Sequence, residues 1–66
     1  MINRKIESFY DVLQLLKSFG FIIYFKDKQD TLTMIESEIR NLYEYGLISK
    51  DQFIKSILII NRKKDE

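Results

Sequence analysis

The chain has 66 residues, of which 45% are hydrophobic and 32% are charged, and its net charge is +1. This balance is typical of a folded globular protein and excludes a disordered chain. Because cysteine and histidine are both absent, disulfides, a thiol nucleophile and the usual zinc ligands are excluded, and the commonest general base is missing.

The N-terminal stretch MINRKIES has basic residues but no apolar core region followed by a cleavage site, and no apolar run approaches the length of a membrane span. We therefore expect neither a secretory signal nor a membrane segment, and we predict a cytoplasmic protein. This length allows one domain, residues 1–66. Because both ends of the chain are basic and the middle is acidic, a contact with nucleic acid would be a local patch.

The first predicted element is a helix over residues 9–19, preceded by a lead-in over residues 1–7. Ser8 and Asp11 have the spacing of a capping box, and Gly20 stands where a left-handed residue ends a helix. The apolar positions repeat at helical steps and are Phe9, Val12, Leu13, Leu16 and Phe19.

The next stretch, FIIYF at residues 21–25, is rich in β-branched and aromatic residues, which favour extended backbone. Since no other segment offers a strand partner, we predict an extended connector that buries Phe21, Ile23 and Phe25 and turns the two side chains between them outward. The alternative is a strand that pairs with a second copy across a dimer, because an unpaired edge invites such addition.

The longest predicted helix spans residues 27–45. Its apolar positions recur at steps of three and four and are Leu32, Ile35, Ile39 and Leu42. Such a helix is about 27 Å long, close to the diameter of so small a domain, so the other segments must pack on this stripe. Asp27 caps its start, and Arg40 is spaced for exposed ion pairs with the glutamates four positions before and after it.

The last predicted helix spans residues 50–61 and is followed by a basic tail at residues 62–64. Gly46 ends the preceding helix, and Ser49 and Gln52 form a capping box. Its apolar positions exceed what one packed face needs and are Phe53, Ile54, Ile57, Leu58 and Ile59 or Ile60. The predicted fold class is therefore all-α, a small three-helix bundle with an extended connector between the first two helices and an antiparallel hairpin of the last two.

The chain lacks the parts of an active site, so we predict a non-enzymatic protein with no catalytic residue, no cofactor and no metal. Its two glycines cannot form a phosphate-cradling loop, and each is explained as a helix terminator. The carboxylates of Asp27 and Asp30 have a spacing that would allow them to hold a cation, but helix capping explains them more simply.

The candidate binding site is a local aromatic and basic patch. Single strands of RNA or DNA are held by bases stacked on aromatic rings and by cations along the backbone. The candidate residues for binding single-stranded nucleic acid are Lys17, Tyr24, Lys26 and Lys28. The competing interpretation is that the aromatic residues fill the core and the lysines only keep the surface soluble. An exposed Tyr24 ring favours stacking, whereas a buried one removes the platform.

A protein-protein interaction or homodimerisation module with no nucleic-acid role is the alternative function. Residues 57–60 are apolar on too many sides for one packed face, and exposed patches of this kind often mark contact surfaces. The competing explanation is that Ile2 and Ile6 of the lead-in cover this end of the helix.

An ordered set of residues extends over about residues 9–62. The set comprises Phe9-Tyr10-Asp11-Val12, Leu15-Leu16-Lys17 with Gly20, Ile23-Tyr24, Asp27-Lys28 with Asp30, Met34, Glu36 and Glu38, Leu42-Tyr43, and Gly46-Leu47-Ile48. In this order the residues resemble the YqgQ-like family of small bacterial proteins. The resemblance implies a three-helix bundle that binds single-stranded nucleic acid. Where family members tend to have Gly and Arg around the capping aspartate, this sequence has Lys26 and Lys28, so the charge is kept while the planar guanidinium fork is lost.

Overall fold

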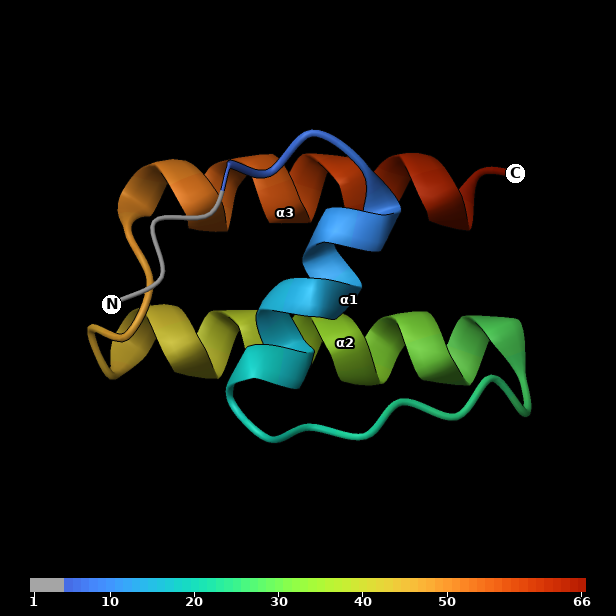
Figure 1. The fold of residues 1–66 in the computed structure, drawn as a ribbon. Helices are drawn as coiled ribbons and strands as arrows, with labels where there is room; N and C mark the ends of the chain where they lie inside the picture. Colours follow the sequence, from blue (N-terminus) through green and yellow to red (C-terminus); the bar gives the residue numbers. More distant parts are fainter. Residues whose placement is uncertain (1–4) are drawn as a thin grey trace.

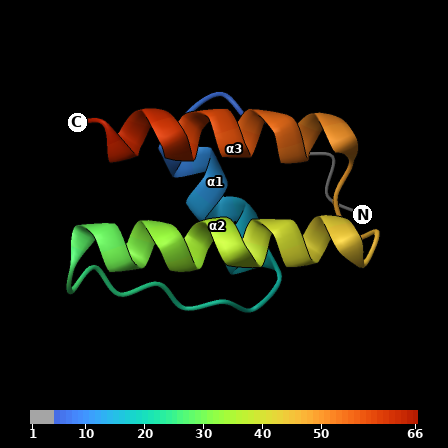
Figure 2. The same ribbon diagram turned by 180° about the vertical axis from the view of Figure 1, so that it is seen from behind.

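Three helices make up the fold in the computed structural model, which describes residues 5–66. They are α1 (Phe9–Ser18), α2 (Lys28–Glu44) and α3 (Lys50–Lys64). Helices α2 and α3 lie side by side and antiparallel, and α1 crosses one face of this hairpin (Figures 1 and 2). The predicted all-α three-helix bundle is confirmed, although α3 continues beyond the predicted residue 61 to Lys64.

Local hydrogen bonds fix where α1 and α3 begin. The Ser8 hydroxyl accepts from the Asp11 N–H at 3.3 Å, and the Asp11 carboxylate accepts from the Ser8 N–H at 3.1 Å. Ser49 and Gln52 exchange the same two bonds at 3.1 and 2.9 Å. Both predicted capping boxes are confirmed, so the N–H groups that a helix start leaves unpaired are partly satisfied by nearby side chains.

Gly20 and Gly46 end α1 and α2 in the same way. Their φ angles are +91° and +73°, a region that strains residues with a Cβ atom. In each turn the glycine N–H donates to the carbonyl three residues back, and the following N–H donates to the carbonyl five residues back. The first turn directs the chain along α2, and the second reverses it into α3 (Figure 1).

The core lies where α1 crosses the hairpin. The predicted stripe of α2 is fully or almost fully buried at all four positions, Leu32, Ile35, Ile39 and Leu42. The other elements contribute Val12, Leu15 and Leu16 from α1, Ile60 from α3, and Ile6 and Ile48 from the segments outside the helices. The expectation that flanking segments cover the stripe of the longest helix is therefore confirmed.

The connector between α1 and α2, residues 19–27, runs along the side of α2 that faces away from α3 (Figures 1 and 2). In the part of the chain that the structure describes, no helix combines the length and the apolar character needed to cross a membrane.

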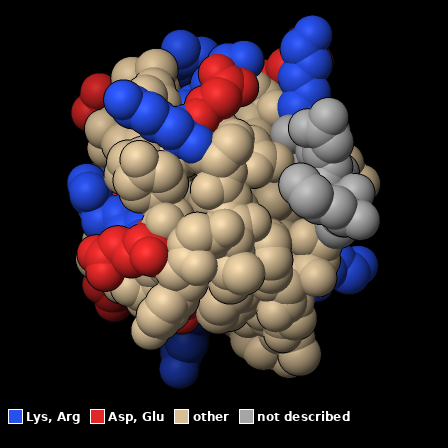
Figure 3. All heavy atoms as spheres, turned by 90° about the vertical axis from the view of Figure 1, so that its left-hand side faces the viewer, with Lys and Arg blue, Asp and Glu red and all other residues tan. Residues whose placement is uncertain are grey.

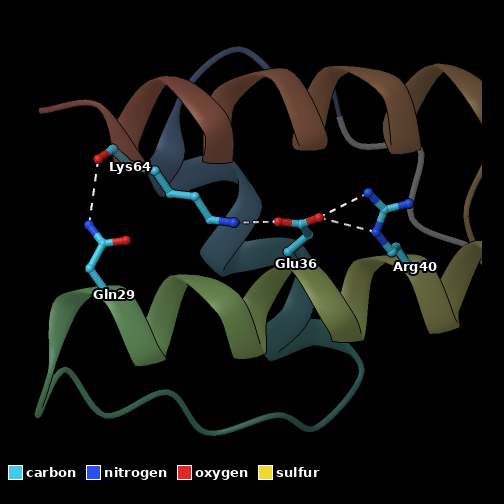
Figure 4. A network of polar contacts seen from close by, with 4 residues as sticks. All are labelled: Gln29, Glu36, Arg40 and Lys64. Carbon is cyan, nitrogen blue, oxygen red and sulfur yellow. Dashed lines mark hydrogen bonds and ion pairs between the residues drawn. The ribbon is translucent and has the colours of Figure 1, made fainter.

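An ion pair joins α2 to α3 on the hairpin surface (Figure 4). The Lys64 Nζ lies 2.6 Å from Glu36 Oε1, and the Arg40 Nη2 lies 2.9 Å from Glu36 Oε2. The Gln29 amide donates to the Lys64 carbonyl at 3.5 Å, a second link between the same two helices. The Glu36 side chain is only 20% exposed, so it is a bridge between helices and not the purely exposed group that the sequence suggested.

Arg40 makes only one of its two predicted ion pairs. It pairs with Glu36, as expected, but among residues 5–66 it forms no ion pair with Glu44. Its guanidinium lies 6.0 Å from the centre of the Phe53 ring on α3. Arg40 is therefore directed toward α3 and away from the end of its own helix.

Replacing Glu36 by glutamine tests the bridge. Hydrogen bonds from Lys64, and next from Arg40, hold the pKa of Glu36 below its ordinary value of 4.5. A carboxyl whose pKa is lower in the folded chain stabilises the fold above its unfolded pKa, and this contribution is lost as the pH falls through the folded pKa. We therefore expect the Glu36→Gln protein to lose about 0.5–1 kcal/mol of unfolding free energy at neutral pH, a figure kept small because the group is partly exposed.

The difference between the wild type and this variant should shrink as the pH falls from neutral to acid values below 4.5, the ordinary pKa of the carboxyl. Urea unfolding at the two ends of this range measures it. Glu38→Gln is the matched control, because among the described residues Glu38 accepts only a long 3.4 Å hydrogen bond from Asn41 on the same helix. Equal stabilities of the wild type and Glu36→Gln proteins at neutral pH would show that the bridge contributes nothing.

Candidate nucleic-acid interface

The connector is fixed to the helices although, within residues 5–66, it pairs with no strand. The buried Thr31 hydroxyl donates to the Tyr24 carbonyl at 3.1 Å. The Asp27 carboxylate accepts from the Asp30 N–H at 3.0 Å, which confirms that it caps α2. The connector therefore follows a defined path from the end of α1 to the cap of α2.

No three His, Cys, Asp or Glu side chains in the described part of the chain are grouped to hold a metal ion.

Side chains alternate along the connector as predicted. Phe21 and Ile23 are half-buried against the core. Between and after them, the Ile22 and Tyr24 side chains are 73% and 76% exposed. The Tyr24 ring is thus open to solvent, which is the condition that stacking requires.

The prediction that Phe25 is buried is wrong. Its side chain is 54% exposed. It contacts the Phe9 ring edge-to-face, with 6.1 Å between the ring centres. At this point the chain leaves the core to reach the cap of α2, so Phe9 covers only part of the Phe25 ring.

The four candidate binding residues lie on neighbouring segments but not in one pocket. Lys17, in the last turn of α1, and Lys26, on the connector, are exposed and form no ion pair within the described chain. Lys28, the first residue of α2, donates to the Glu66 main-chain carbonyl at 3.3 Å. Lys17 and Lys26 line separate hollows, and Tyr24 lies outside both. Two of the three cations are therefore unengaged.

Lys17 belongs to a mainly apolar groove of about 290 Å³ between α1 and the connector. The other lining residues are Leu13, Gln14, Phe21, Ile22, Ile23 and Phe25. Leu13 also packs against the core, as its place in the apolar repeat of α1 predicts, whereas that repeat does not point to Gln14. The available signal was the spacing of three between Gln14 and Lys17, which sets both on one side of a helix.

Most of the apolar side chains at residues 57–60 of α3 are covered by other parts of the protein. Within residues 57–60, Leu58 is 57% exposed, whereas the three isoleucines are buried or half-buried. Ile6 is buried in the core, as expected of a lead-in that covers the helix, and Ile2 lies outside the described residues. Ile54, one turn before Leu58, is also exposed. The exposed remainder is thus a pair of side chains four residues apart.

Another exposed surface, with few charges near its centre, lies at the end of the molecule where α2 turns into α3. Figure 3 views this end directly and shows charged side chains mainly around its margin. Tyr45 and Leu47 are exposed in the turn, and the Tyr43 ring stacks on Phe53 with 4.4 Å between the ring centres. Because the lysines and arginines in this view lie at the margin and not beside the exposed aromatic side chains, we do not include this end in the candidate interface.

The fold and the connector define a small all-α protein whose first two helices are joined by an exposed aromatic segment. The chain belongs to the YqgQ-like family, whose model matches residues 6–66. It is similar to the uncharacterized protein YqgQ of Bacillus subtilis (strain 168), with 34% identity over 59 residues that cover 89% of this chain and 83% of that protein. The family inferred from the order of residues is confirmed.

Proposed function

We propose that this protein binds single-stranded RNA or DNA along connector residues 21–26 and catalyses no reaction. The observation that carries the proposal is the Tyr24 ring, which is 76% exposed on an extended segment fixed to α2. An aromatic ring open to solvent beside cations is what base stacking on a single strand needs. Because Thr31 holds the Tyr24 carbonyl, this part of the backbone is positioned before binding, which lowers the ordering cost.

The lysines supply the contacts to phosphate in this proposal. Lys26 follows Tyr24 by two positions, and Lys17 lies where α1 leads into the connector. Both are exposed and free of ion pairs in the described part of the chain, so their ammonium groups are available. Lys28 would have to give up its bond to the Glu66 carbonyl, so we expect it to contribute less than Lys26.

Replacing Tyr24 by alanine tests the stacking platform. We expect the affinity for a labelled single-stranded oligonucleotide to fall by about 1–3 kcal/mol, or about 5- to 150-fold, if one base stacks on the ring. Fluorescence anisotropy titrations at fixed salt measure the change. Tyr24→Phe is the matched control, because it keeps the ring and should bind as the wild type does.

Because the Tyr24 side chain is exposed, the Tyr24→Ala protein should keep the wild-type helix content and unfolding midpoint. Circular dichroism checks both. If this folded variant binds as tightly as the wild type, base stacking on Tyr24 is ruled out.

A protein-protein interaction or homodimerisation module is the second candidate. The exposed Ile54 and Leu58, one turn apart on α3, are the observation that favours it. The apparent mass across a protein concentration series separates the two functions. If the apparent mass is that of a monomer at all concentrations, homodimerisation is ruled out.

A further inference from the structure

We infer that the groove between α1 and the connector holds one nucleobase of the bound strand, and that the Gln14 carboxamide hydrogen-bonds the edge of that base. This inference rests on the proposed function and extends it from base stacking to base selection. Its evidence is independent of Tyr24, which lies outside the groove.

Among residues 5–66, Gln14 is the one uncharged polar side chain that lines the groove. Its side chain is half-buried, and its carboxamide takes part in no hydrogen bond among residues 5–66. A carboxamide offers two N–H donors and one acceptor oxygen. In a mainly apolar groove, such a group is what orients a bound ligand and makes the site selective.

The volume and the lining residues of the groove suit a base. Its volume of about 290 Å³ is at the lower end of the range for ligand pockets, so it has room for one planar ring system. Its apolar wall includes Phe21 and Phe25, and the contact with Phe9 orients the Phe25 ring. A base has apolar faces and a polar edge, and the groove presents apolar walls and one amide. Phe25 is partly exposed because its ring forms part of the wall of this open groove.

The charge of the groove favours a nucleotide over an uncharged aromatic ligand. Lys17 lies one turn from Gln14 on the same helix and lines the same groove, and no carboxylate from the described part of the chain lines it. A base in the groove would place its own phosphate within reach of this unpaired ammonium group. The groove therefore combines the apolar, amide and cationic contacts that one nucleotide can use.

The test compares four homopolymeric oligonucleotides of equal length on the wild type and on two groove variants. We expect the wild type to distinguish the homopolymers, and Gln14→Ala to bind its preferred one about 3- to 10-fold more weakly, which is the effect of one hydrogen bond. This variant should also lose the preference and keep the wild-type salt slope. Lys17→Ala should weaken all four complexes alike and reduce the salt slope by about 0.7, the value for one phosphate on a single strand.

Asn61→Ala is the matched control, since it removes an exposed amide from α3 that does not line the groove. Unfolding midpoints show whether each variant is folded. If Gln14→Ala binds all four homopolymers as the Asn61→Ala protein does, the base site is overturned, while salt-dependent binding by the wild type would leave the proposed function standing. If the wild type shows no salt-dependent binding, both are overturned.

Discussion

Replacing Leu16 by alanine is expected to lower the free energy of unfolding by about 2–5 kcal/mol. Leu16 is fully buried in the cluster where α1 crosses the hairpin. Removal of its side chain loses the transfer free energy of the deleted atoms and leaves a cavity that the surrounding helices fill only in part. A single core in so short a chain supplies only about 3–5 kcal/mol, so this variant should lie near or beyond its unfolding midpoint without denaturant.

Leu58→Ala is the matched control for this large effect. The substitution is chemically the same, but the Leu58 side chain is 57% exposed on α3. We expect a change within about 0.5 kcal/mol, since little apolar surface leaves or enters water. Urea unfolding followed by circular dichroism measures both variants. Similar losses at positions 16 and 58 would contradict the packing of α1 across the hairpin.

Replacing Ser56 by leucine is expected to give the second largest loss, about 1–3 kcal/mol, because extra methylene groups in a packed interior force side chains out of their preferred rotamers. Ser56 is fully buried on the inward side of α3, three residues after Phe53 and four before the buried Ile60. A small side chain at this position fits the space that the interior leaves.

Replacing Ser56 by alanine should instead raise the free energy of unfolding. The Ser56 hydroxyl is buried and has no hydrogen-bond partner among residues 5–66. Removing an unpaired buried hydroxyl relieves its desolvation cost, and alanine also has the higher helix propensity, so we expect a gain of about 1 kcal/mol. The same urea experiment measures it. A loss of stability in the alanine variant would show that the hydroxyl is bonded in solution, for example to a buried water.

Sequence patterns predicted the features that depend on neighbours along the chain. The starts of α1 and α3 depend on Ser8 and Ser49 and on residues three positions later. Their counterparts at the ends, Gly20 and Gly46, adopt a backbone conformation that few other residues tolerate. The burial of the α2 stripe followed from its period, because one side of a helix must face the core.

Features that depend on contacts between distant segments could not be predicted. Glu36 and Lys64 are 28 positions apart, so only the helix hairpin brings them together. The partial exposure of Phe25 and the groove beside it likewise depend on the path of the connector from the end of α1 to the cap of α2. The predicted end of α3 is three residues too early, although the basic residues of its last turn suit the negative end of a helix dipole.

In the candidate site, too, features set by neighbouring residues could be predicted, and features set by distant segments could not. The exposure of Tyr24 followed from the alternation of side chains along an extended segment. Which lysines are free to contact phosphate could not be predicted in this way, because the contact of Lys28 with the Glu66 carbonyl depends on where α3 ends. The spacing of Gln14 and Lys17 sets both on one side of α1, but the groove that gives Gln14 a role is formed by the connector and cannot be predicted from the helix alone.

The most direct test of nucleic-acid binding is a titration of the wild-type protein with a labelled single-stranded oligonucleotide at several salt concentrations. Each phosphate contact on a single strand contributes a slope of about −0.7 to the plot of log affinity against log salt concentration. We therefore predict a slope of about −1.4 when Lys17 and Lys26 are engaged, and about −2 when Lys28 also joins. Absence of binding at low salt, or an affinity that salt does not change, would contradict the proposal.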